Sequence, residues 1–175
     1  MQTKIDLCSQ ALLKIGENAI TSFTGNTPAA KVAKGLYDLT IDSLLSMHPW
    51  RFATKKWNLV KNSDDDFIIP ADCLRIISVN ARRFEIVGNR IFSPNKNIEI
   101  KGIVRVDAAK FPAAFSRAAV TKLAMEFSIP LTGNQNTYAL MNAVYENELR
   151  DARFIDSSSD QGNPINDFSL VTARN

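Results

Sequence analysis

The chain has 175 residues, of which 45% are hydrophobic and 22% charged, and its formal net charge is +3 at neutral pH. This composition is typical of a globular domain and excludes a disordered chain, and no apolar run approaches the roughly 18 residues that cross a bilayer. Polar residues such as Asp6 and Lys14 interrupt the first apolar segment. We therefore expect no secretory signal and no membrane contact, and a protein that stays in the cytoplasm where it is made.

Apolar residues recur at helical spacing near the N-terminus and predict a helix from Thr3 to Ile15. Thr3 is the expected N-cap, and Asp6 three residues later comes close to a capping box. Gly16 is the expected stop, because glycine adopts the left-handed conformation that ends many helices.

A second helix is predicted to begin at Thr27-Pro28, an N-cap followed by proline at the first helical position, and to run to about Met47. Close packing against a neighbouring helix is the simplest reason for Gly35 inside it, since glycine there costs roughly 1 kcal/mol relative to alanine. The expected buried stripe consists of residues at helical spacing, Val32, Leu36, Leu39, Ser43 and Leu44, with Ala29, Ala33 and Tyr37 beside it.

Short runs rich in Val, Ile and Phe then replace the helical pattern and predict a small antiparallel sheet with one face on the helices. The runs are Trp57–Val60, Phe67–Ile69, Cys73–Asn80, Arg83–Val87, Arg90–Phe92 and Ile98–Val106. Gly88-Asn89 lies between the fourth and fifth runs, and a two-residue loop of this type favours a tight hairpin.

Helical spacing returns in the last third of the chain. A third helix is predicted to open at Phe111-Pro112 and to end at Pro130. A fourth is predicted to begin within residues 133–136 and to end near Ile155. The expected fold class is therefore α+β, a bundle of about four helices with a small antiparallel β-sheet inserted between helices 2 and 3, plus an extended C-terminal tail.

We expect one domain in residues 1–155, with helices in 1–56 and 108–155 and the sheet in 57–107, followed by an extended arm in residues 156–175. The arm is rich in Ser, Asp, Asn and Gly, a composition that cannot bury enough apolar surface to fold alone. Stretched out, about 20 residues reach on the order of 65 Å, enough to cross a neighbouring subunit. The arm nevertheless carries four apolar residues that a solvating tail would not need, Ile165, Phe168, Leu170 and Val171.

The residues whose side chains could take part in catalysis or metal binding are few and dispersed. The single histidine, His48, is interpreted as a helix-end residue, and together with Cys8 and Cys73 it does not reach the ligand count of a zinc site. In a reducing compartment both cysteines are predicted to be buried thiols without a disulfide. Asp64-Asp65-Asp66 has carboxylates that suit a divalent cation, but it lacks EF-hand spacing, and a solvated loop is the other interpretation. We find no nucleotide motif, serine elbow or paired carboxylates such as a cell-wall hydrolase needs. No catalytic residue, cofactor or metal is predicted, and the protein is not expected to be an enzyme.

A basic stretch with aromatic neighbours follows the second helix. It contains four basic and three aromatic residues, Arg51, Lys55, Lys56 and Lys61 with Trp50, Phe52 and Trp57. Such a stretch fits a surface on which nucleic-acid bases stack. In the other interpretation the rings pack the junction between helices and sheet, and the lysines face water. Both interpretations are open on the sequence alone.

Four short motifs occur in a set order, and each has a role in forming the fold, as a helix end, a helix stop that brings a tryptophan into the core, a turn and a helix start. They are Lys14-Ile15-Gly16-Glu17, His48-Pro49-Trp50-Arg51-Phe52-Ala53, Ile69-Pro70-Ala71-Asp72-Cys73-Leu74-Arg75, and Phe111-Pro112 with Leu123-Ala124. Together, over approximately residues 3–155, they resemble the tail tubular protein A family, the adaptor proteins (also called gatekeepers or connectors) of podovirus tails.

The resemblance implies a structural protein of the virion, located at the portal vertex. Members of that family form a dodecameric ring beneath the portal protein, receive the tail nozzle protein below, and surround the channel through which DNA is ejected. The resemblance further implies that the arm binds the portal through Ile165, Phe168, Leu170 and Val171, and that basic residues near the channel meet DNA without reading its sequence. Arg51, Lys55, Lys56 and Lys61 are the possible channel residues. The alternative function is a DNA-binding or packaging accessory protein, which the same basic stretch would support.

Overall fold

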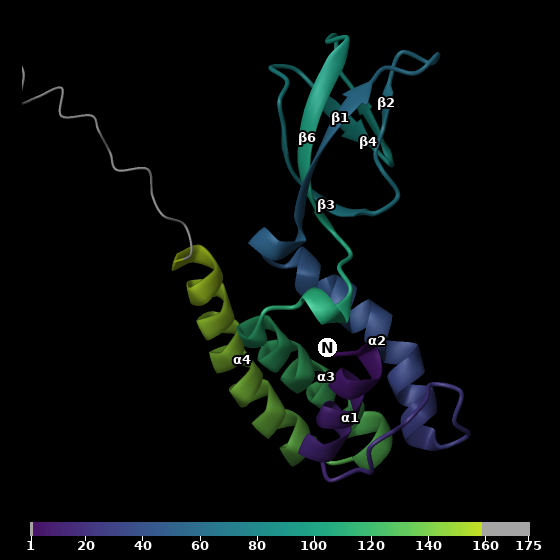
Figure 1. Ribbon diagram of the computed structural model, residues 1–175, viewed down its shortest axis with the longest axis vertical. Coiled ribbons are helices and arrows are strands. Elements are labelled where there is room, and N and C mark those ends of the chain that lie inside the picture. The colour runs from purple at the N-terminus through teal and green to yellow at the C-terminus, as the bar shows by residue number, and fades with distance from the viewer. Residues whose placement is uncertain (1, 159–175) are drawn as a thin grey trace, which may run out of the picture.

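The computed structural model describes residues 2–158 of the chain. In this part of the chain, four α-helices form a body at one end of the molecule and six strands form two small sheets at the other (Figure 1). The helices are α1 (Lys4–Lys14), α2 (Pro28–Ser46), α3 (Ala113–Thr132) and α4 (Gln135–Ser158). The predicted α+β class, with strands inserted between the second and third helices, is confirmed. The strands divide into two sheets where one was predicted.

Helix α1 begins and ends as its sequence predicts. The Thr3 side chain accepts a hydrogen bond from the Asp6 N–H at 3.1 Å, and the Asp6 carboxylate accepts one from the Thr3 N–H at 2.8 Å, which completes the capping box. At the other end Gly16 has a φ of +83°, and the Glu17 N–H donates to the Leu12 carbonyl at 3.0 Å. This is a Schellman motif, which satisfies carbonyls that the helix end would leave unpaired.

Helix α2 buries a face that only partly matches the predicted one: Leu44 and the flanking Ala29, Ala33 and Tyr37 are buried as expected, and Val32 and Leu36 are half-buried. The buried side comprises Ala29, Ala30, Ala33, Tyr37, Thr40, Ile41, Leu44 and Leu45. Leu39, expected in the stripe, is 70% exposed, and Ser43 is exposed as well. The alanine-rich side is the one that lets a neighbouring helix approach closely, and α3 is the helix that packs along α2. The close packing expected at Gly35 is also wrong, because a Cβ there would meet nothing within 4 Å.

Helix α3 is the centre of the body and packs against α1, α2 and α4. Phe115, Leu123 and Phe127 are fully or almost fully buried along it, as their spacing predicts. The predicted stop at Pro130 is wrong, because α3 continues through Pro130 to Thr132 and ends at Gly133, whose φ is +61°. Proline this close to the C-terminus removes one backbone hydrogen bond and leaves only a short stretch of helix beyond it.

Two three-stranded antiparallel sheets occupy the other end of the molecule, in the orders β1-β6-β3 and β2-β5-β4. The strands are β1 (Thr54–Val60), β2 (Phe67–Ile68), β3 (Cys73–Val79), β4 (Glu85–Val87), β5 (Arg90–Phe92) and β6 (Asn97–Val104). Phe67, Ile91, Ile98 and Ile100 form a second buried cluster, separate from the main core. The predicted tight hairpin at Gly88-Asn89 joins β4 to β5, with a φ of +60° at Gly88.

Two short 3-10 helices, η1 (Arg51–Ala53) and η2 (Ala108–Lys110), connect the strands to the helical body. The chain therefore crosses between the two parts twice, once before β1 and once after β6 (Figure 1). Within residues 2–158, none of the helices has the length and apolar character needed to cross a membrane.

Two glycines give a matched pair of stability tests. A Cβ at Gly102 in β6 would lie 2.8 Å from the Arg75 carbonyl oxygen and 2.8 Å from the Cys73 sulfur, so Gly102→Ala forces the backbone of β3 to move. We expect this change to lower the free energy of unfolding by about 1–3 kcal/mol. Gly35→Ala meets no atom and should instead raise it by up to about 1 kcal/mol. Urea titration of both variants measures this, and equal effects of the same sign would contradict it.

Candidate interaction surfaces

A cluster of aromatic rings joins the helical body to the sheets. Trp50 is 1% exposed, and its indole N–H donates to the Leu44 carbonyl at 3.0 Å. The centroid of the Phe115 ring in α3 lies 4.9 Å from that of Trp50 and 4.8 Å from those of Phe52 and Phe111, in edge-to-face geometry. Such contacts add to the large apolar area that each ring buries. The His48-Pro49-Trp50 motif is thus a packing feature, as its sequence predicts.

The C-terminal end of α4 is fastened to this junction by one carboxylate. Asp156 accepts hydrogen bonds from the Arg51 backbone N–H at 3.2 and 3.3 Å, and its Oδ2 lies 3.4 Å from His48 Nε2. Burial lowers the pKa of His48, and the charge of Asp156 opposes that shift. The contact fixes the place at which the chain leaves α4, beside the connection between body and sheets.

The structure places the predicted basic stretch in a set of local ion pairs. Lys55 contacts Asp72 at 2.9 Å, Lys56 contacts Glu99 at 3.0 Å, and Lys61 contacts Asp65 at 2.6 Å. The aromatic residues of the stretch are drawn inward: Trp50 is buried, Phe52 packs on the main core and Trp57 on the second cluster. Charges neutralised in pairs and rings turned inward favour the packing interpretation of this stretch over a base-stacking surface.

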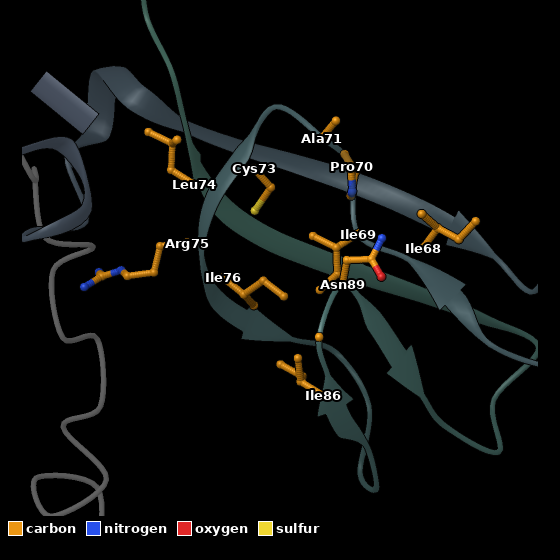
Figure 2. A pocket seen from close by; sticks show the side chains of 11 residues that line it. Ile68, Ile69, Pro70, Ala71, Cys73, Leu74, Arg75, Ile76, Ile86 and Asn89 are labelled. Carbon is orange, nitrogen blue, oxygen red and sulfur yellow. The ribbon is translucent and has the colours of Figure 1, made fainter. Parts of the chain in front are cut away.

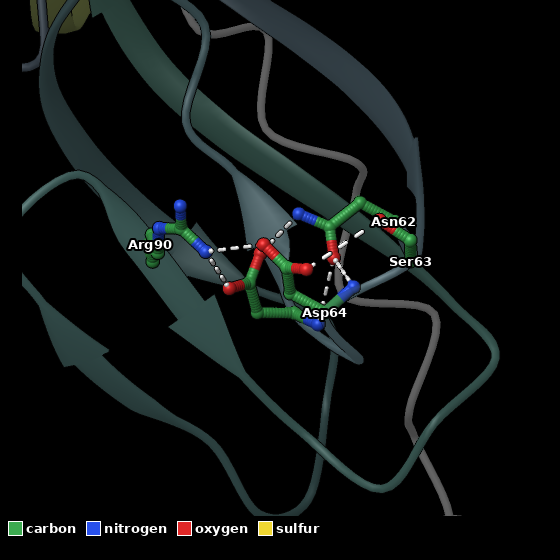
Figure 3. Close-up of polar contacts among 5 residues, drawn as sticks. Asn62, Ser63, Asp64 and Arg90 are labelled. Carbon is green, nitrogen blue, oxygen red and sulfur yellow. Dashed lines mark hydrogen bonds and ion pairs between the residues drawn. The ribbon is translucent and has the colours of Figure 1, made fainter.

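The acidic run Asp64-Asp65-Asp66 lies in a loop in which two carboxylates contact one arginine (Figure 3). Arg90 on β5 contacts the Asp64 carboxylate at 3.2 Å and the Asp66 carboxylate at 2.5 Å. Asn62 completes the loop, because its side chain donates to Asp66 and accepts from the backbone N–H groups of Asp64 and Asp66. Asp66 is 1% exposed, so a buried carboxylate here takes an arginine as its counter-ion. The loop is therefore a structural feature rather than an open cluster of metal ligands.

The remaining chemically active groups are held apart. Within residues 2–158, no group of three or more His, Cys, Asp or Glu side chains lies close enough to hold a metal ion. Cys8 and Cys73 are free thiols, as predicted. Burial raises the pKa of the Cys8 thiol to about 12 and raises that of Cys73 as well, which disfavours the reactive thiolate at both positions.

A pocket of about 680 Å³ lies between β3 and β4, at the edges of the two sheets (Figure 2). Its walls are mostly aliphatic, and Figure 2 shows Ile76 and Ile86 near each other, with Ile69 beside Asn89. Arg75 and Leu74 lie at the side that faces the helical body (Figure 2). The sequence analysis did not identify this pocket, because the division of the strands into two sheets has no signal in residue spacing.

Two exposed apolar faces lie at opposite sides of the helical body. In Figure 1, α2 and α4 flank the body, and α3 packs against both of them. Leu39 on α2 is 70% exposed, and Leu140 and Phe154 on α4 are 60% and 73% exposed. Single exposed apolar side chains are common on protein surfaces, so these two helix faces are candidates for contacts and not established interfaces. The arm residues predicted to bind a partner, Ile165, Phe168, Leu170 and Val171, lie outside the described residues.

The sequence model described as Tube: Tail tubular protein matches residues 6–161, which is most of the chain. The chain belongs to the tail tubular protein family. As a tail tubular protein it is a structural component of a bacteriophage tail, and its place of function is the virion. No curated protein matches the sequence. A structural role in the tail agrees with the surfaces described above, which are candidates for contacts with other proteins.

The loop around Arg90 gives a test that separates a structural role from cation binding. Asn62→Ala removes three side-chain hydrogen bonds that hold the backbone around the buried Asp66, so the free energy of unfolding should fall by about 1–3 kcal/mol. Ser63→Ala is the matched control, because Ser63 is exposed and, within residues 2–158, its side chain makes a single 3.5 Å contact, to Asp64. Millimolar Mg²⁺ or Ca²⁺ should leave the Tm of the unchanged protein where it is, and a clear rise in Tm would contradict the account.

Proposed function

We propose that this tail tubular protein is the head-to-tail adaptor of a short-tailed phage. In this role it forms a ring beneath the portal protein, receives the tail nozzle protein below, and surrounds the DNA channel. The observation that carries the proposal is the family match over residues 6–161. The structure supports it through a rigid body whose exposed features are apolar faces and a fixed chain exit. A protein of this kind works by burying surface, so the proposal includes no enzymatic activity.

The proposal assigns different roles to two parts of the chain. Residues 1–155 are the adaptor body, and residues 156–175 are the arm that binds the portal, although α4 itself continues to Ser158. The bonds from Asp156 to His48 and Arg51 hold the base of the arm in one place on every subunit. In a ring, the arms would then leave the body at the same height around the circle. The apolar arm residues Ile165, Phe168, Leu170 and Val171 are the proposed contacts with the portal.

A closed ring needs two different patches on each subunit, placed so that one contacts the other on the next copy. The exposed faces of α2 and α4 fit this requirement, because they lie at opposite sides of the body (Figure 1). Their charges are complementary as well. Lys31 and Lys34 on α2 and Glu146 and Asp151 on α4 form no ion pair within residues 2–158. We propose that α2 of one subunit contacts α4 of the next.

The alternative, a DNA-binding or packaging accessory protein, rests on Arg51, Lys55, Lys56 and Lys61. Three of these already contact carboxylates, so few counterions would be released when DNA binds. The channel of an adaptor needs no strong contact with DNA, because the genome must pass through it. We therefore retain these residues only as possible channel residues in the proposed ring.

Truncation of the arm tests the portal contact. A chain that ends at Ser158 should still fold, because the buried core of the helical body extends no further than Ala152. It should lose binding to the portal protein of the same phage in a pull-down at equal concentrations. A full-length variant with Ile165, Phe168, Leu170 and Val171 changed to serine should lose binding too, whereas Asn166→Ser with Thr172→Ser should not. Equal binding by the truncated and full-length chains would contradict the proposed arm.

Mixing two variants tests the ring contact. Leu39→Asp and Leu140→Asp each place a charge on an exposed patch, so each should fold normally and fail to form rings. An equimolar mixture of the two restores one intact interface and should give dimers but no rings, which native mass spectrometry measures on portal-free protein under ring-forming conditions. Rings formed by either single variant would show that the contact lies elsewhere. Glu17→Gln, outside both faces, is the control.

A further inference from the structure

The two strands beside the 680 Å³ pocket leave an open edge in each sheet. Strand β3 pairs only with β6, and β4 pairs only with β5, so each presents a row of unpaired backbone groups. The two strands follow each other in the chain and are joined by residues 80–84. We call the pocket together with these two edges the seam. An unpaired edge beside an apolar pocket is the arrangement to which an extended segment adds as a further strand.

The apolar side chains of the seam are more exposed than isoleucine and valine usually are in a folded protein. All three residues of β4 are exposed, with Ile86 at 44% and Val87 at 55%. Ile76 and Ile77 of β3 are only half-buried. Native sheets usually protect such edges with charges, proline or bulges, and β3 does carry two register shifts along its pairing with β6. β4 is only three residues long and begins with the charged Glu85, yet its Ile86 and Val87 side chains remain exposed beside the pocket.

We propose that residues 165–171 of the same chain occupy the seam before assembly, as an added strand between β3 and β4. This inference rests on the proposed function, because it means that the portal protein must displace the segment from the seam in order to bind it. The seam would then protect the apolar arm residues from premature contacts. It would also make release of the arm depend on the portal.

The length and origin of the arm fit this occupant. The chain leaves α4 beside the junction, where Asp156 contacts His48, and the positive charge of Arg75 helps to lower the pKa of His48. Arg75 also lines the pocket on the side of the helical body (Figure 2). Arg75 thus lines the pocket and also acts electrostatically on His48, which contacts Asp156 near the end of α4. Six residues separate Ser158 from Ile165, so the seven Cα–Cα steps between them span at most about 25 Å when extended.

The sequence of the segment fits the chemistry of the seam. In an extended strand Phe168 and Leu170 point to one face and Asp167 and Ser169 to the other. The first pair would fill the aliphatic pocket between Ile76 and Ile86. Arg75 lines the pocket, and Arg82 and Arg83 lie in the connection between β3 and β4; none of the three forms an ion pair within residues 2–158. Asp167 supplies a carboxylate on the face that can reach such a charge.

Amide hydrogen exchange on the free, full-length protein tests the inference. In the unchanged chain, the amides of residues 74–79 and 85–88 should exchange slowly. Phe168→Asp with Leu170→Asp should speed their exchange at least tenfold, whereas Ser169→Asp, on the other face of the segment, should change it less than twofold. Equal exchange in all three proteins would overturn the inference. Protection that grows with protein concentration would assign the segment to a second copy and would also overturn it.

A second pair of variants tests the seam itself. Ile86→Asp puts a charge in the pocket, whereas Val87→Asp puts one on the opposite face of the same exposed strand. Ile86→Asp should speed amide exchange in residues 165–171 at least tenfold and Val87→Asp should not, with exchange in α3 unchanged in both. Ile86→Asp should still bind the portal, since it frees the arm. Loss of portal binding on truncation with no change in arm exchange on Ile86→Asp would reject the seam while leaving the proposed function intact.

Discussion

The packing of Phe115 against Trp50 is the contact on which the rest of the structure depends. Phe115 belongs to α3, the helix that packs against all three others, and Trp50 lies where the chain first leaves the helical body for the sheets. Because both rings are almost completely buried, the body and the junction share one core. The neighbouring His48 and Arg51 then hold Asp156, so the end of α4 is set by the same junction.

This arrangement separates a rigid interior from surfaces left for partners. The charged groups that the sequence offers for binding are mostly paired within the molecule: Arg90 neutralises the acidic loop, and Lys55, Lys56 and Lys61 contact carboxylates. Apolar side chains also stay uncovered, on the outer faces of α2 and α4 and at the seam between β3 and β4. A structural protein that assembles with copies of itself and with other tail components has use for such surfaces.

Features set by local physics were predictable from the sequence. The capping box at Thr3, the left-handed Gly16 and the hairpin at Gly88 depend on residues within one turn of chain, so their motifs identify them. The buried face of α2 was only partly predictable, because leucine and alanine positions both fit helical spacing and only the approach of α3 decides between them. The seam was missed for the same reason, since strand order is a tertiary property.

The candidate surfaces divide in the same way. The sequence identified the basic stretch and the acidic run correctly as charged segments, but the partners that neutralise them lie far away in the chain, as Glu99 does for Lys56 and Arg90 for Asp66. The sequence shows which residues are charged, but only the fold shows whether a charged side chain has an ion-pair partner. The family assignment, carried by motifs that form the fold, was the inference that needed no such tertiary information.

A reconstruction of the portal vertex in the mature virion by electron cryomicroscopy tests the central claim most directly. The account predicts a closed ring of this chain between the portal and the tail nozzle, with density for its last residues against the portal and α2 of each subunit next to α4 of the following one. A reconstruction that places this chain at the far end of the tail, or in the ring with its C-terminus turned away from the portal, would contradict it.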